Sequence, residues 1–252
     1  MTRDWDASTY DRVSEPQVAW AREVLGRLHL RGDETVLDAG CGSGRVTRML
    51  LELLPQGQVV AVDAAPSMVE QARAGLPPDR VKVLPPIDLT ELELDEPVDM
   101  VFSNAVFHWV QDHDVLFARL HAALEPGGRL VAQCGGAGNV ERFLQVATEV
   151  ASKPPFAEYL AGWTGPWRFE APQPTEERLR RAGFDEARCW LSPSTVVPSE
   201  PREFLRTVCL GHHLDVLPEE LRDDFVTGVA ERWGEPLELD YVRLNIDARR
   251  SR

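Results

Sequence analysis

The chain has 252 residues, of which 43% are hydrophobic and 27% charged, so it is long enough to bury a sizeable core. Lys and Arg number 27 against 41 Asp and Glu, which gives a net charge of -14. This balance disfavours a nucleic-acid partner, since binding a phosphate backbone requires clustered positive charge, although a local basic patch would escape that argument. We find neither a signal peptide nor a long apolar run, and therefore expect a cytoplasmic protein with no membrane partner.

The cysteines and histidines do not indicate a metal site. Cys41, Cys134, Cys189 and Cys209 are far apart and form no C-x-x-C pair, so the sequence predicts neither zinc nor a disulfide framework. The adjacent pair at 212–213 cannot face one way on a helix, which argues against a pair of metal ligands. We expect no metal.

The first elements place a ligand-binding turn early in the chain. A helix is predicted over 16–28, where apolar residues recur at helical spacing. A short strand then ends at Asp38, and three glycines alternate at Gly40, Gly42 and Gly44 before an amphipathic helix opens at Arg45. Glycine permits positive φ and close approach of backbone N–H groups to a ligand, and a helix N-terminus favours a negative group. This strand–turn–helix pattern predicts a ligand site.

The spacing of the glycines indicates which ligand the turn binds. In the dinucleotide pattern G-x-G-x-x-G the third glycine would fall at Arg45, whereas Gly44 comes one residue early. Asp38, two residues before Gly40, suits a ligand with an ammonium group. The second predicted strand, 58–62, is followed by Asp63, which could accept hydrogen bonds from both hydroxyls of a ribose. We therefore expect a ligand with a ribose and a cationic end.

Later elements continue an alternation of strands and helices. Strands are predicted over 81–84, 98–102 and 129–134, with a helix over 114–124. Because ligands bind beyond the carboxyl ends of parallel strands, the segment from Asn104 to Trp109 should lie at the reaction centre.

The pattern changes after residue 135. We expect helices over 140–151, 175–182, 199–210 and 218–233, and strands over 184–191 and 237–248. The stretch 154–174 is rich in Pro, Gly and aromatic residues, which predicts either part of a cap over the site or a packed surface excursion.

The motifs together resemble those of class I S-adenosylmethionine (SAM) dependent methyltransferases. The run 38–44 followed by Asp63 is similar to motif I and the acidic loop of that family, and further matches fall at Asp88, at 103–105 and at 124–130. The similarity covers residues 10–134. It implies an α/β fold: a Rossmann-like, seven-stranded, mostly parallel sheet with helices on both faces, an antiparallel last strand and a helical, aromatic cap. We expect one domain over 1–252, with a SAM-binding core at 30–135 and substrate-selecting segments at 136–174 and 198–234.

The resemblance also implies which residues bind SAM. Asp88 would accept a hydrogen bond from the adenine amino group while Ile87 packs on the ring, although the preceding Pro85-Pro86 shifts the register and leaves a plain loop acid as an alternative. Met68 would pack on the adenine or fill the core, and Tyr10 would either cover the methionine end or pack the N-terminal arm. Cys41 is expected to fill space beside the ligand and not to act as a nucleophile. The expected cofactor-binding set is Asp38, Gly40, Cys41, Gly42, Gly44, Asp63, Ala64, Met68, Ile87, Asp88, Asn104, Ala105 and Tyr10.

Within that family the segment 102–113 is most similar to trans-aconitate methyltransferases, which esterify a small polycarboxylate. Asn104-Ala105, Trp109, Asp112-His113 and Pro198-Ser199 match; His108 departs, since those enzymes carry an amide there. Juvenile-hormone-acid methyltransferases have a similar His-Trp pair and also esterify a carboxylate.

A small carboxylate, methylated by in-line displacement, is therefore the first hypothesis for the substrate. A hydroxyl, amine or carbon acceptor is the alternative, and a SAM-binding module without catalysis or an NAD-dependent oxidoreductase is a more distant one. His108 is the candidate catalytic residue, as a base if one is needed. Trp109, Trp163 and Arg168 are the candidate substrate-binding residues, with Arg12 a second cation to test; either arginine could equally be solvated. The oligomeric state is not defined by the sequence.

Overall fold

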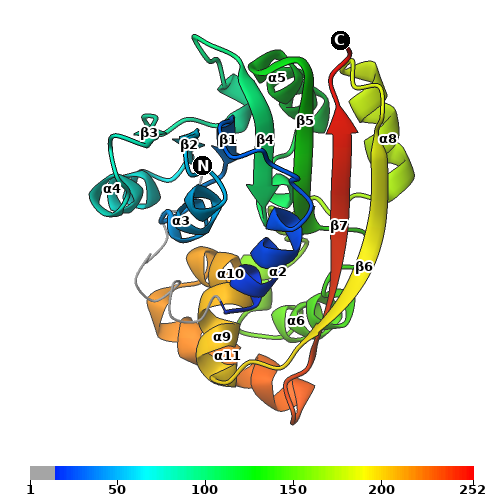
Figure 1. The fold of residues 1–252 in the computed structure, drawn as a ribbon. Helices are drawn as coiled ribbons and strands as arrows, with labels where there is room; N and C mark the ends of the chain where they lie inside the picture. The colour runs from blue at the N-terminus through cyan, green and yellow to red at the C-terminus, as the bar shows by residue number, and fades with distance from the viewer. Residues whose placement is uncertain (1–14) are drawn as a thin grey trace.

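The computed structural model describes residues 15–252, with side chains from residue 18 onward. Its centre is a seven-stranded sheet of order β3-β2-β1-β4-β5-β7-β6 (Figure 1). Strand β7 runs antiparallel to both of its neighbours, β5 and β6. This confirms the expected fold. The strands are β1 (Thr35–Ala39), β2 (Gln58–Val62), β3 (Val81–Val83), β4 (Val98–Asn104), β5 (Leu124–Gly135), β6 (Arg188–Val196) and β7 (Leu239–Arg249).

Helices cover both faces of this sheet. Alternation along β1 sends Val36 to one face, which α2, α3 and α4 cover, and Leu37 and Ala39 to the other, which α5 and α8 cover. The helices here are α2 (Glu15–Leu25), α3 (Arg45–Glu52), α4 (Pro66–Gly75), α5 (His113–Ala123) and α8 (Pro172–Arg181), with short 3-10 turns η1 (Leu89–Glu91) and η2 (Phe107–Trp109).

A second group of helices lies at the end of the sheet where the parallel strands finish (Figure 1). These are α6 (Glu141–Ala151), α7 (Ala157–Leu160), α9 (Pro201–Phe204), the π-helical turn η3 (Leu205–Cys209), α10 (Gly211–Val216) and α11 (Glu219–Trp233). They share an apolar core with the neighbouring ends of β6 and β7. We call this group, with its connecting loops, the cap.

Two predicted elements differ in detail. The sixth strand begins at Arg188, not at 184, because Phe184 is buried in the core and makes only an isolated bridge with Arg250. The single helix expected over 199–210 is divided into α9 and η3, where the backbone widens to the π-helical pattern beside the pocket described below.

The packing of the cap core predicts that truncating one of its buried side chains lowers the free energy of unfolding. Phe225 is fully buried in α11 and meets Phe156 edge to face, with ring centroids 5.1 Å apart. We expect Phe225→Ala to lower the free energy of unfolding by about 3–5 kcal/mol, through lost burial and a residual cavity. Tyr159→Ala, at an exposed position in α7, should change it by only about 0.5 kcal/mol. Denaturant titration measures both, and equal effects would contradict this view of the cap core.

Candidate functional site

The glycine turn lies between β1 and α3 and is fixed to β2. Gly40 and Cys41 donate backbone hydrogen bonds to the carbonyl of Val62, at 2.8 and 2.9 Å. Gly40 has φ 92°, and a Cβ there would lie 2.2 Å from Cγ2 of Val106. Gly42 has φ 54°, and a Cβ there would meet nothing within 4 Å. The turn is thus packed on one side and open on the other.

Asp63 holds this turn from the end of β2. Its two carboxylate oxygens accept hydrogen bonds from the backbone N–H groups of Gly42 and Ala65, each at 2.9 Å. Burial raises the pKa of Asp63, and these N–H groups oppose that rise. The N–H of Gly42 is therefore directed to a carboxylate, and not outward as the sequence pattern suggested.

Asp38 is a second buried acid, at the end of β1. Its side chain accepts a hydrogen bond of 2.7 Å from the hydroxyl of Thr47. Burial raises its pKa to about 7, and the neighbouring charge of Asp63 acts in the same direction. A cationic ligand beside these two carboxylates would favour their ionised forms.

These groups line one pocket of about 620 Å³. A pocket of this size is typical for small molecules and cofactors. Of the residues expected to bind the cofactor, Asp38, Gly40, Cys41, Gly42, Asp63, Ala64, Met68, Asp88, Asn104 and Ala105 line it. Burial raises the pKa of the Cys41 thiol, which keeps it protonated and supports a space-filling role. We call this half of the pocket the cofactor half.

Two expected contacts fall elsewhere, and a third lies outside the described residues. Gly44, with φ 84°, does not line the pocket; a Cβ there would meet Leu76, and the residue turns the chain into α3. Ile87 packs against the sheet core, because its neighbour Asp88 is the residue that turns toward the pocket. The Asp88 side chain also caps η1 by accepting hydrogen bonds from Thr90. Tyr10, like Arg12, lies outside the described residues.

His108 lines the pocket and is buried, with its ring centroid 4.7 Å from that of Trp109 and 5.9 Å from that of Phe169. Its Nδ1 accepts a hydrogen bond of 3.2 Å from the N–H of Gly135. Burial lowers its pKa well below the usual value, and the charges of Arg243 and His113 lower it further. The ring is thus neutral with its proton on Nε2, where it can donate a hydrogen bond, and its lowered pKa makes it a weak base.

Aromatic side chains line the other half of the pocket, which we call the acceptor half. Trp109 contributes to this wall as expected, but Trp163 does not. Trp163 lies behind the wall, edge-on to Trp167 and His213 with centroids 5.7 and 4.4 Å apart, and packs on the cap core. The rings that line this half include Trp20, Trp109, Phe143, Trp167, Phe169, His212 and Tyr241.

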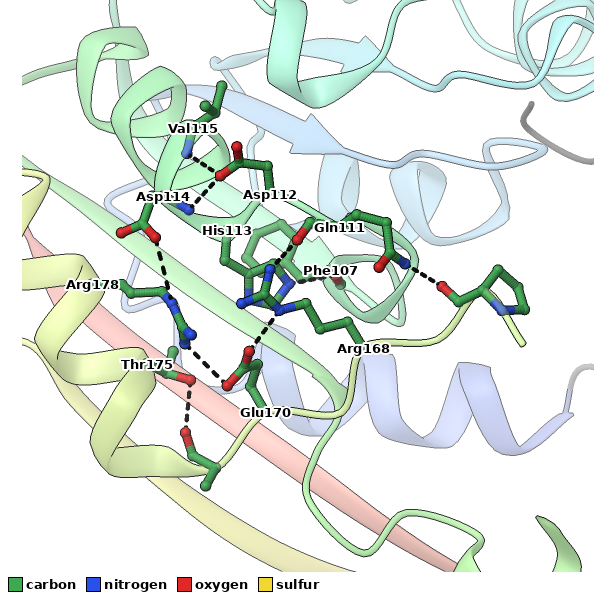
Figure 2. Close-up of polar contacts among 12 residues, drawn as sticks. Phe107, Gln111, Asp112, His113, Asp114, Val115, Arg168, Glu170, Thr175 and Arg178 are labelled. Carbon is green, nitrogen blue, oxygen red and sulfur yellow. Dashed lines mark hydrogen bonds and ion pairs between the residues drawn. The ribbon is translucent and has the colours of Figure 1, made fainter. Parts of the chain in front are cut away.

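Arg168 does not reach the pocket, contrary to expectation. Its Nε lies 2.6 Å from Oε1 of Glu170, and its Nη1 donates to the carbonyl of Gln111 (Figure 2). Glu170 also pairs with Arg178 of α8, at 3.0 Å. Burial works to raise the pKa of Glu170, but hydrogen bonds from the two arginines hold it below its usual value. We call Arg168, Glu170 and Arg178 the Glu170 cluster. The guanidinium of Arg168 is bound by Glu170, two residues along the chain, and by the carbonyl of Gln111.

The Glu170 cluster fixes the loop that carries Trp167 and Phe169. The N–H of Arg168 donates to the carbonyl of His108 at 2.8 Å, and the N–H of Ala137 donates to the carbonyl of Glu170 at 2.9 Å. Two of the aromatic rings are therefore held between the segment after β4 and the segment after β5.

Among the described residues, the arginine that lines the acceptor half is Arg243, which the sequence analysis missed. It lies in β7, is 3% exposed, and its guanidinium carbon lies 4.1 Å from the ring centroid of Trp20. It pairs across the sheet with Gly135, the residue that donates to His108. Tyr241, Arg243 and Asn245 alternate with apolar residues, which places them on one face of the strand and could have drawn attention to Arg243. A polar face of this kind on an antiparallel strand usually points to solvent.

Comparisons with known proteins agree with this geometry. The family described as a methyltransferase domain matches residues 37–130, which include the glycine turn and Asp63. A trans-aconitate 2-methyltransferase of Methylobacterium nodulans is 29% identical over 99% of both chains, and one of Azoarcus sp. is 39% identical over 51% of this chain and 50% of that one.

The chain is a SAM-dependent methyltransferase with the class I fold. Solved structures share its fold at low identity. Phosphoethanolamine N-methyltransferase 2 of Haemonchus contortus, in complex with phosphomonomethylethanolamine and S-adenosylhomocysteine, covers 98% of this chain and 57% of its own with a TM-score of 0.62 and 20% identity. The YcgJ protein of Bacillus subtilis covers 93% and 99%, with a TM-score of 0.64 and 14% identity.

The cofactor half suits SAM. The open face of Gly42 leaves space beside the turn, and the buried carboxyls of Asp38 and Asp63 favour a ligand that carries positive charge. Within residues 15–252, no three His, Cys, Asp or Glu side chains gather in a way that could hold a metal. In the same part of the chain, no helix is long and apolar enough to span a bilayer.

The raised pKa of Asp38 predicts a pH dependence of SAM affinity. Below about pH 7 this carboxyl is protonated in the free enzyme, so binding a cation must release a proton and becomes weaker as the pH falls. We expect the dissociation constant to rise by up to about tenfold per pH unit between pH 7 and 5.5. Calorimetric titration of SAM measures this. Asp38→Asn should bind SAM more weakly with little pH dependence, and a flat profile in the unsubstituted enzyme would contradict the assignment.

The Glu170 cluster predicts an effect confined to the acceptor. Glu170→Gln keeps the size of the side chain but weakens both ion pairs, so the loop with Trp167 and Phe169 should loosen. We expect KM for the acceptor to rise on the order of tenfold, with SAM affinity unchanged. Glu149→Gln, which weakens a surface pair with Arg232, is the matched control and should leave both constants unchanged. An equal loss of SAM affinity in Glu170→Gln would contradict this role.

Proposed function

We propose that the enzyme methylates the carboxylate of a small organic acid, giving a methyl ester. The observation that carries the proposal is Arg243, a buried guanidinium in the acceptor half of the pocket. Guanidinium groups bind carboxylates through charge-assisted hydrogen bonds, often two at once. Such a group, set among aromatic rings, would select an acid over a neutral acceptor.

The curated relatives support the same class of acceptor. The matches from Methylobacterium nodulans and Azoarcus sp. carry the name trans-aconitate 2-methyltransferase, and the first aligns over nearly the whole of both chains. Identity of 29% supports an acid as acceptor but does not define which acid.

The chemistry of His108 also favours an acid. A carboxylic acid is ionised at neutral pH and needs no base, whereas an amine or hydroxyl acceptor would usually need one. With its pKa lowered and its Nδ1 engaged by Gly135, His108 is a poor base. We propose that His108 donates a hydrogen bond from Nε2 to the acid and thereby orients it.

The remaining residues would bind and align the two reactants. Asp38, Asp63 and the turn around Gly42 would hold the cofactor; SAM supplies a methyl group activated by its sulfonium, for in-line transfer to an oxygen of the acid. Arg243 would hold the carboxylate, and the aromatic walls would exclude water. Alignment of this kind can supply roughly 7–11 kcal/mol of the reduction in barrier. The ester product has lost its charge, so its ion pair with Arg243 is lost and release is favoured. A cytoplasmic location stays a prediction.

Replacing Arg243 tests the proposal. Arg243→Gln should lower kcat/KM for the acid by about 30-fold or more, since losing one partner of a buried charge pair costs about 2–5 kcal/mol. SAM affinity should be unchanged, because the residue lies in the acceptor half. The assay is S-adenosylhomocysteine release with a panel of small acids.

Two further variants guard against a misfolded protein. Arg243→Lys keeps the charge and should retain part of the activity, while Arg249→Gln, at the far end of β7 and paired loosely with Glu186, should behave as the unsubstituted enzyme. Full activity of Arg243→Gln on an acid, or turnover only with amines or phenols, would overturn the proposal.

A further inference from the structure

The acceptor half offers few positive charges to a bound acid. Among the described residues that line the pocket, the cationic ones are Arg45 and Arg243. Arg45 opens α3 directly after the glycine turn and so belongs to the cofactor half. Within the described chain, the acceptor half therefore presents one guanidinium, which matches one carboxylate.

Acidic residues around the pocket make further carboxylates unfavourable. Asp38, Asp63 and Asp88 line the cofactor half, and Asp112 lines the pocket beside Trp109 while capping α5. A second or third carboxylate on the acceptor would be buried near like charges. An unpaired buried carboxylate carries a large desolvation cost.

The walls suit an apolar body. Trp167 and Phe169 lie nearly parallel, with an interplanar angle of 12° and centroids 6.5 Å apart, and Trp109 lies 6.3 Å from Trp167. Trp20 and Tyr241 line the pocket beside Arg243, with ring centroids 4.9 Å apart. Aromatic rings of this kind stabilise flat or aliphatic groups by burying apolar surface and by offset stacking.

Two neutral polar side chains that line the pocket accept hydrogen bonds within the fold. Asn139 accepts a hydrogen bond from the N–H of Val242 at 3.0 Å, and His108 accepts one from Gly135. Each keeps a donor, the amide N–H of Asn139 and the Nε2–H of His108, so the selection against further carboxylates rests on charge and not on a lack of hydrogen-bond donors.

We infer that the acceptor is an acid with a single carboxylate on an aryl or short alkyl body, and not a tricarboxylate such as trans-aconitate. Arg243 binds the carboxylate, and the rings of Trp109, Trp167 and Phe169 enclose the apolar part. This inference rests on the proposed function and narrows its substrate class.

The test compares acids that differ in charge and apolar surface. S-adenosylhomocysteine release is measured with the full enzyme and SAM, using cinnamate, phenylacetate and hexanoate against trans-aconitate and citrate. We expect kcat/KM to be about tenfold or more higher for the best monocarboxylate than for trans-aconitate, because two of the three carboxylates of the latter would be buried without a partner. The highest value for trans-aconitate would overturn this inference and leave the proposed function standing. Turnover with amines or phenols alone would overturn both.

A binding measurement decides the case in which no acid in the panel is methylated. Calorimetric titration of cinnamate into the complex with S-adenosylhomocysteine should show binding, and trans-aconitate should bind more weakly; the absence of cinnamate binding would overturn the inference. Trp167→Leu should weaken cinnamate binding several-fold, since the stacking surface is lost, with little change for trans-aconitate. Equal losses for both acids would contradict the role given to the aromatic wall.

Discussion

A buried guanidinium in the face of a sheet is the constraint around which the acceptor half of the pocket is arranged. Arg243 is retained there by the ring of Trp20 on one side and by Oε1 of Gln133, 3.4 Å from its Nε, on another. Gln133 in turn donates to Asn245 at 2.9 Å. Trp20 comes from α2, Gln133 from β5 and Asn245 from β7, so the position of one side chain depends on elements far apart in the sequence. Fixing the charge in advance lowers the entropy lost when an acid binds.

The cofactor half of the pocket is lined by buried acids, whereas the acceptor half contains a buried cation. Asp38 and Asp63 lie at the carboxyl ends of two adjacent parallel strands, where the topology brings them together. The two halves therefore carry opposite charges, negative toward the cofactor and positive toward the acid. His108, whose Nδ1 is held by Gly135, lines the same pocket beside Trp109 and Phe169.

Local patterns in the sequence were sufficient for the core of the fold and for most of the cofactor half. The glycine turn, Asp38 and Asp63 could be predicted because each lies at the end of a strand, and parallel topology then determines where they meet.

The same local patterns could not show which of Arg168 and Arg243 lines the pocket. Both are arginines near aromatic residues, and their roles depend on which groups they contact in the folded chain. Glu170 and the carbonyl of Gln111 engage Arg168. Arg243 faces inward because α2 covers its side of β7 with Trp20. Ile87 and Gly44 do not line the pocket, because their neighbours in the turns face it instead: Asp88 beside Ile87, and Ser43 and Arg45 beside Gly44.

The most direct test of this account is a crystal structure of the enzyme with S-adenosylhomocysteine and cinnamate. We expect the carboxylate of cinnamate to lie about 3 Å from the guanidinium of Arg243, with its ring among Trp109, Trp167 and Phe169. A carboxylate bound away from Arg243, with the ring outside this aromatic wall, would contradict the central claim that this arginine selects an acid as methyl acceptor.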